Sequence, residues 1–473
     1  MDRTLSLLAF AVAASGATAA EPPALTIYRT DGDALFANGG SPVGDGYAIV
    51  HESRALKLDG GRQSLVVDGL PSTLDAEAVS VDLGAGARVL GQRVLSSGDG
   101  SLLSAHRGER VTIGVGSERI DGILVGIDSG APIVRDASSG QVVYVRDYDT
   151  LRFGQGGGAP GSTLQIAVDG KPGSVSAMLT YPTSGLGWRA SYSMRLLDGD
   201  ACRARLEALA SIANRSGRDY ANATIKLVAG SPNISRGGGP HPVAYKAMAA
   251  APAPESLPEQ ASLGDYRSYA IDGALDLPDA SVTQVPLYAP GEIGCERRWI
   301  AESGGAWFPA KPMLAEGASS TQGAPVVSEI RFTPGENLPA GNLRVLTRDR
   351  DGRIEFLGDA RIADTQKGRA VSIELGNAFD LRMTRERTAF SLDKAARAMD
   401  EAFRITLSNT GEKARTVTVR EHPNRWRAWT LQSSSQKPVK QSPDLLEFEV
   451  AVPANGNATL DYAVKYAWTP KDE

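Results

Sequence analysis

The side chains that most often carry catalysis are scarce in this chain. It has four histidines and two cysteines among 473 residues. The histidines are His51, His106, His241 and His422. No GxSxG occurs, and the SxxK at Ser391 to Lys394 lacks the SDN and KTG partners that would give it meaning. Carboxylates are abundant, but an acid/base pair cannot be assigned without geometry. The sequence therefore names no catalytic residue, and we expect a protein that is not an enzyme.

Metal and cofactor chemistry finds equally little support. A zinc site needs three or four ligands, and neither CxxC, HxH nor HExxH is present. The "DRDG" at 349–352 looks like the start of a calcium loop, but Ala360 stands where such a loop needs a bidentate Glu. We interpret it as an Asp-Gly hairpin turn and expect no metal and no cofactor.

Aromatic side chains offer the best candidates for binding. The stretch "EHPNRWRAW" (421–429) brings together His422, Trp426 and Trp429, and a second pair is Trp299 and Trp307. Exposed, such residues would bind a carbohydrate or a peptide. The alternative, which the pattern favours, is that the tryptophans close the end of a β-sandwich.

Cys202 and Cys295 are the only thiols. In an oxidising compartment an even pair indicates a disulfide, which here would close a loop of about ninety residues and contribute about 4–5 kcal/mol. The alternative is a pair of reduced, buried cysteines acting as small apolar residues.

The first twenty residues have the pattern of a secretory signal peptide. Arg3 precedes an apolar stretch from Leu5 to Ala14, and the small residues that follow place cleavage near Ala19 or Ala20. An uncleaved anchor is the alternative. No later segment is apolar enough to span a bilayer. We expect a periplasmic or secreted protein without a membrane span after cleavage.

Composition and alternation predict an all-β fold. The chain has 52 Gly and 27 Pro, which favours many turns, and its net charge of −5 gives no reason to expect a nucleic acid partner. In "WRASYSMRLL" from residue 188, apolar side chains occupy every second position. Such pure alternation favours a strand face buried in a core over a ligand platform. Rows 188–196, 202–212 and 221–229 predict an antiparallel meander.

Five parts follow from these patterns. Five short strands in 108–153 suit a small SH3-like barrel, 235–262 lacks periodicity, and 393–402 is a helical turn or a charged loop. The parts are a signal peptide (1–20), an N-terminal β domain (21–104), the SH3-like barrel (105–155), a β-sandwich with a disordered loop at 235–262 (160–335), and a C-terminal Ig-like β-sandwich (336–473).

Two stretches carry a resemblance to a family. "YPTSGLGWRASYSMRL" and "ANRSGRDYANATIKLVAGSPN" resemble the secreted bacterial proteins with domain of unknown function 4139, in a Trp-x-x-x-Tyr strand and an Asn-x-[ST]-Gly-x-[DE]-[WY] turn. "EHPNRWRAW" and "ATLDYAVKYAW" match its C-terminal half, so the resemblance covers roughly 160–470. It implies a fold and no catalytic residues.

We therefore expect a non-enzymatic structural or interaction module of the bacterial cell envelope. Its partner would be an envelope protein or a glycan. The alternatives are a carbohydrate- or peptide-binding protein that uses the tryptophans named above, and a hydrolase with a carboxylate pair brought together from distant strands.

Overall fold

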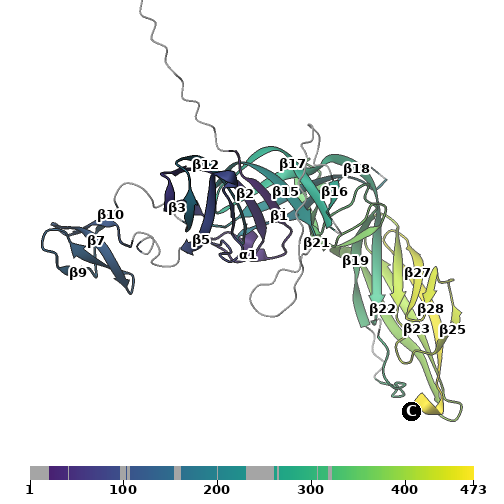
Figure 1. The fold of residues 1–473 in the computed structure, drawn as a ribbon. Coiled ribbons are helices and arrows are strands. Elements are labelled where there is room, and N and C mark those ends of the chain that lie inside the picture. The colour runs from purple at the N-terminus through teal and green to yellow at the C-terminus, as the bar shows by residue number, and fades with distance from the viewer. Residues whose placement is uncertain are drawn as a thin grey trace, which may run out of the picture. The chain divides into compact units, whose positions relative to one another are not determined.

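The computed structural model describes most of the chain and is almost entirely β (Figure 1). The described residues are 21–40, 42–95, 103, 107–153, 161–199, 201–230, 260–263, 266–305, 307–317 and 322–472. The predicted signal peptide (1–20) and residues 235–259 of the predicted loop lie outside them. Among the described residues no helix has the length and apolar character needed to cross a membrane. The all-β prediction is confirmed.

The described residues form two compact units, and each unit combines separate stretches of the chain. The first draws on Met1–Arg189 and Ala210–Leu287, and the second on Ala190–Leu209 and Tyr288–Glu473. Strands predicted for different domains share a sheet in the first unit, because residues 24–58 pair with strands between 173 and 229.

In the first unit, one sheet has seven strands and includes residues 221–229, which were predicted as the third strand of the meander. Its order is β16 (Gln260–Leu263), β17 (Tyr266–Leu277), β15 (Tyr220–Ala229), β1 (Ala24–Tyr28), β2 (Ala48–Leu58), β12 (Gly173–Thr183) and β4 (Ser80–Asp82). A three-stranded sheet has the order β3 (Gly61–Leu70), β11 (Ser162–Gly170) and β5 (Ala87–Leu95). The short helices α1 (Asp33–Phe36) and η1 (Gly84–Gly86) lie in connections.

Trp188 and Tyr192 are core residues, as predicted. Both lie on β13 (Leu186–Leu196) and are 0% and 3% exposed. The Trp188 indole Nε1 donates to the Val228 carbonyl oxygen at 3.0 Å, and the Tyr269 ring meets the Trp188 ring edge-on at 6.0 Å. This face is therefore not a ligand platform.

The predicted meander is wrong in its third strand. β13 neighbours β14 (Arg203–Asn214), but β15 pairs in parallel with β1 and antiparallel with β17. After Asn214 the chain does not return beside β14, and the buried Arg215 side chain donates to the carbonyl oxygens of Leu35, Ala37 and Gly39. The predicted disordered loop (235–262) is also wrong at its C-terminal end, because residues 260–262 belong to β16.

The five strands predicted within 108–153 form one antiparallel sheet with its own core. The order is β10 (Thr150–Phe153), β6 (Arg110–Val115), β7 (Glu118–Asp128), β8 (Ala131–Asp136) and β9 (Val142–Tyr144). The last strand returns beside the first, as the barrel interpretation requires. Its buried cluster includes Ile113, Leu124 and Val134.

Ten strands form the main path of the sheet that builds the second unit. The order is β21 (Ile354–Ile362), β20 (Gly341–Arg348), β13, β14, β18 (Ser281–Ser303), β19 (Gln322–Phe332), β22 (Val371–Asp393), β23 (Ala398–Asn409), β28 (Gly456–Ala467) and β25 (Trp429–Ser434). Off this path, β24 (Arg415–Glu421) pairs with β18 and β27 (Leu445–Val452), and β27 pairs with β26 (Lys440–Ser442). The 3-10 helix η2 (Pro470–Asp472) follows β28.

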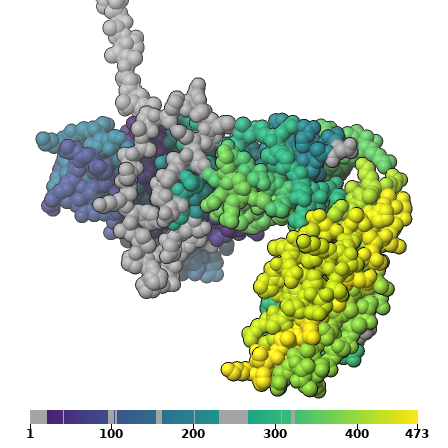
Figure 2. Space-filling view, turned by 90° about the vertical axis from the view of Figure 1, so that its right-hand side faces the viewer, coloured from purple at the N-terminus to yellow at the C-terminus, as the bar shows by residue number. Residues whose placement is uncertain are grey.

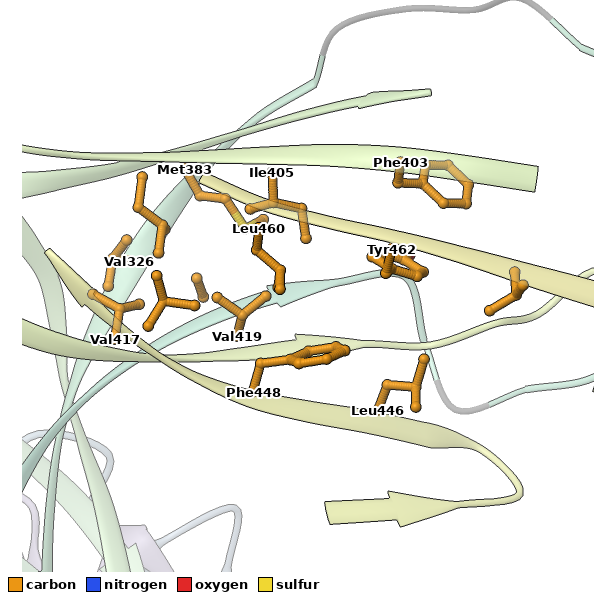
Figure 3. Packing of buried hydrophobic residues seen from close by; sticks show 14 of the residues in the cluster. Val326, Met383, Phe403, Ile405, Val417, Val419, Leu446, Phe448, Leu460 and Tyr462 are labelled. Carbon is orange, nitrogen blue, oxygen red and sulfur yellow. The ribbon is translucent and has the colours of Figure 1, made fainter. Parts of the chain in front are cut away.

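The C-terminal strands make a two-layer sandwich around an apolar core. In Figure 3 the side chains of Val417, Val419 and Phe448 face those of Ile405 and Leu460 from the opposite layer. Alternation along each strand supplies one such face per layer. Figure 2 shows the closely packed outer surface of these strands in green and yellow.

Two connections in this unit decide between structures that the sequence left open. Asp349 and Gly352 close the hairpin between β20 and β21, with the Gly352 N–H donating to the Asp349 carbonyl at 3.1 Å, so the hairpin interpretation is confirmed. The segment 393–402 is not helical. It is the end of β22, a turn, and the start of β23, because Ala398 and Met399 pair with β28 and are buried.

Candidate functional site

The cluster His422, Trp426 and Trp429 lies against the sandwich core. Trp426 is 2% exposed, and the Trp429 indole Nε1 donates to the Pro443 carbonyl oxygen at 2.6 Å. His422 Nδ1 lies 2.6 Å from the Asp444 carbonyl oxygen, and its Nε2 lies 3.0 Å from Glu302 Oε1. The ring nitrogens of His422 and Trp429 thus have partners within the protein.

Trp299 and Trp307 lie in different surroundings. Trp307 is 50% exposed, in the segment that follows β18. Trp299 is half-buried on β18 and lines a pocket of about 610 Å³. Of the five residues proposed from the sequence, Trp299 is the one that lines this cavity.

The pocket lies at the end of the sandwich where β23 turns into β24. Its floor comes from β18 and β19, where Trp299 pairs with Ser328. One wall is the β22 stretch Gly376–Leu381, and another is the turn from Asn409 to Lys413. Arg415, the first residue of β24, completes it.

Two arginines in the pocket have no acidic partner within the described part of the chain. Arg297 and Trp299 are two residues apart on β18 and therefore lie on one face. The Arg415 guanidinium lies 4.5 Å from the centre of the Trp299 ring, a cation–π contact. Reduced solvation and the positive charge of Arg415 lower the pKa of Arg297. Two like charges held together in this way favour an anion between them.

Other lining side chains bring charge and hydrogen-bonding groups of both kinds. Lys413 adds a third cation, and Asp380 and Glu412 are acidic. Ser328 is 9% exposed, and its Oγ has no hydrogen-bond partner among the described residues.

An exposed aromatic ring stands at the same cavity. Phe379 lines the pocket and is 87% exposed. Leaving a phenyl ring in water forgoes about 2 kcal/mol of burial. The ring is therefore available to pack against a bound molecule.

The strongest buried charge clusters lie elsewhere and suit structural roles. Glu52 accepts from Arg218 and from the Tyr181 hydroxyl, and Glu421 accepts from Arg385 and the Tyr462 hydroxyl. A third carboxylate, Glu401, is 4% exposed and pairs with Arg425 at 2.7 Å. These three carboxylates are paired and closed off from solvent, so they hold charge inside the fold and are not open to a substrate. No group of three potential metal ligands occurs in the described residues.

Cys202 and Cys295 form the predicted disulfide. Their Cα atoms are 5.0 Å apart, and the bridge spans a sequence separation of 93 residues. The alternative of reduced cysteines is therefore wrong for this structure.

The sequence did not reveal Arg297, Ser328, Phe379 or Arg415 as site residues. They come from four separate strands, and their types are common on any protein surface. The one available signal was the spacing of Arg297 and Trp299 on a single strand, which places a cation beside an aromatic ring.

The fold and the pocket define an all-β protein with a cationic and aromatic cavity in its C-terminal sandwich. The family model for Domain of unknown function (DUF4139) matches residues 177–470. This match covers more than half of the chain, so the protein belongs to that family, as the resemblance in the sequence indicated. The comparison with curated proteins gave no match.

Proposed function

We propose that this protein is a secreted, non-enzymatic binding module of the bacterial cell envelope that holds a polar ligand of the envelope in the pocket of its second unit. The signal-peptide pattern supports the location. The observation that carries the binding role is the arginine pair of Arg297 and Arg415, which has no acidic partner in the described residues and lines the cavity.

The types of side chain that line the pocket support binding rather than turnover. General acid–base chemistry needs a titratable group within reach of a bound substrate. Two carboxylates, Asp380 and Glu412, line the pocket, but no histidine or cysteine does.

Co-sedimentation with a washed bacterial cell-envelope fraction tests the proposal. The purified full chain should sediment with the envelope, and Phe379→Ala should reduce the bound fraction severalfold. Phe356→Ala is the matched control, because Phe356 is 58% exposed in the same unit but does not line the pocket. Binding that is insensitive to Phe379→Ala, or release of soluble sugar or peptide above the blank, would contradict the proposal.

A further inference from the structure

We propose that the ligand of the pocket is an acidic saccharide. Its carboxylate would lie between Arg297 and Arg415, and one sugar ring would pack on Phe379. This inference rests on the proposed binding function and names the ligand class for the same site.

The arginine pair selects an anion. Guanidinium groups bind carboxylates and phosphates through parallel N–H···O bonds. Arg297 lines the cavity and is exposed, and Arg415 contacts the Trp299 ring. Both cations therefore face one space with donors available to a ligand.

The balance of charge favours a single carboxylate over a phosphate monoester. Three cationic and two acidic side chains line the pocket, leaving a local excess of one positive charge. A carboxylate matches that excess. A phosphate monoester, with about −1.5 to −2 charges at neutral pH, would place its second charge near Asp380 and Glu412.

The remaining lining suits the hydroxyl groups and ring of a sugar. Asp380 and Glu412 accept hydrogen bonds, and Ser328 and Lys413 donate them. The C–H face of a pyranose packs on an aromatic ring, and Phe379 offers one that is 87% exposed. The cavity volume of about 610 Å³ lies in the range of small-ligand sites.

Recognition of an extended peptide fits less well. Such recognition normally uses a free strand edge. On β18, Trp299 pairs with Ser328 on one side and with Val417 on the other. In the wall, the Arg382 guanidinium already donates to the carbonyl oxygens of Ala378 and Phe379, both at 3.0 Å. The pocket therefore presents side chains, rather than free backbone N–H and C=O groups, to a ligand.

Calorimetric titration of the full chain tests the ligand class. The probes are trigalacturonate, its fully methyl-esterified form, triglutamate and inorganic phosphate. Trigalacturonate should bind at least about tenfold more tightly than the neutral ester, because the charged hydrogen bonds are lost with the ester. This comparison uses the unaltered protein, so it does not depend on the folding of any variant.

Variants then locate the site. Arg297→Gln and Arg415→Gln should each weaken trigalacturonate binding about tenfold or more. Arg353→Gln in the exposed hairpin is the matched control and should leave binding unchanged. Circular dichroism and thermal unfolding verify that each variant is folded.

The other outcomes separate this inference from the proposed function. Tighter binding of triglutamate or phosphate, or equal binding of the ester, would overturn the saccharide assignment. Failure of every probe while the envelope still retains the chain would overturn this inference alone. Failure of every probe together with loss of co-sedimentation would overturn both.

Discussion

Glu52 and Glu421 are both buried carboxylates that accept hydrogen bonds from an arginine and a tyrosine, but their pKa values move in opposite directions. Burial opposes ionisation of Glu52. The two hydrogen bonds from Arg218, both 2.8 Å, and the charge of Arg54 nevertheless lower its pKa. Burial dominates at Glu421, where Oε1 has no hydrogen-bond partner among the described residues, and raises its pKa despite Arg385.

The lowered pKa of Glu52 predicts a pH-dependent contribution to stability. A carboxyl group with a depressed pKa in the folded state stabilises the protein above its unfolded pKa, near 4.5, and loses that contribution as the pH falls through the folded value. Glu52→Gln should therefore cost about 3–5 kcal/mol at pH 7, because Arg218 keeps a buried charge without its partner. The cost should shrink as the pH falls below 4.5.

Hydrogen exchange of the β2 and β12 amides at several pH values measures this cost within the first unit. Glu421→Gln is the comparison variant, and its cost is measured on the β24 amides of the second unit. Its cost at pH 7 should be smaller, because burial already disfavours the ionised form. A cost for Glu52→Gln that does not vary between pH 7 and pH 3 would contradict the argument.

Each of the two units contains a turn of the same kind, which is built on an asparagine at the end of a strand. Asn214 ends β14, and its Nδ2 donates to the carbonyl oxygens of Arg218 and Leu277 at 2.7 and 2.8 Å. Asn409 ends β23 and donates to those of Lys413 and Pro453 at 2.9 and 3.0 Å. In each case Oδ1 accepts the N–H two residues later. The side chain thus replaces the backbone partners that the turn lacks.

The two turns differ in what covers them. In the first unit Arg215 bonds three carbonyl oxygens of the Leu35–Gly39 region, so that turn is closed by the protein itself. In the second unit the residues after Asn409 line the pocket. The same element is therefore structural in one unit and forms a wall of the candidate site in the other.

Asn409→Ala should destabilise the second unit and loosen the pocket wall. Two backbone carbonyls in partly buried hydrogen bonds lose their donor, which costs about 1–3 kcal/mol. We expect faster hydrogen exchange in the 409–415 turn and weaker ligand binding. Asn457→Ala, at an exposed strand position, is the control and should change the unfolding free energy by less than about 0.5 kcal/mol. Equal effects of the two substitutions would argue against this role of the Asn409 side chain.

At the scale of the whole molecule, the chain leaves the second unit at Leu209 and returns to it at Tyr288. The disulfide joins Cys202, in the departing segment, to Cys295, in the returning one, and the Cys295 N–H also donates to the Cys202 carbonyl oxygen at 3.0 Å. The bridge therefore fixes the second unit at the point where its chain is interrupted.

Replacing both cysteines by serine should destabilise the second unit. The chain-entropy model assigns about 4–5 kcal/mol to closure of a loop of this length. Denaturant unfolding of the variant and of the oxidised protein measures the difference, and mass spectrometry without reductant should find no free thiol in the latter. An unfolding free energy that stays the same in the variant would show that the strand pairing alone holds these segments together.

Several features followed from local patterns. Alternation from Trp188 to Met194 predicted a buried face because side chains on a strand point to its two sides in turn. The hairpin at Asp349–Gly352 followed from turn chemistry, and the disulfide followed because the chain has one pair of cysteines. The family resemblance rested on the same strands and on the Asn214 turn.

The partners of the strands, and with them the pocket, depended on the tertiary structure. Ladder hydrogen bonds join backbone groups that every residue carries, so the sequence of β15 does not say that it pairs with β1 rather than β14. Trp299, Ser328, Phe379 and Arg415 likewise meet only once four strands have found their neighbours. The sequence by itself determined which faces are buried, because burial is encoded residue by residue along each strand. Tertiary structure decided which strands lie side by side, and hence which polar side chains share a cavity, because that choice minimises the free energy of the whole core rather than of any one segment.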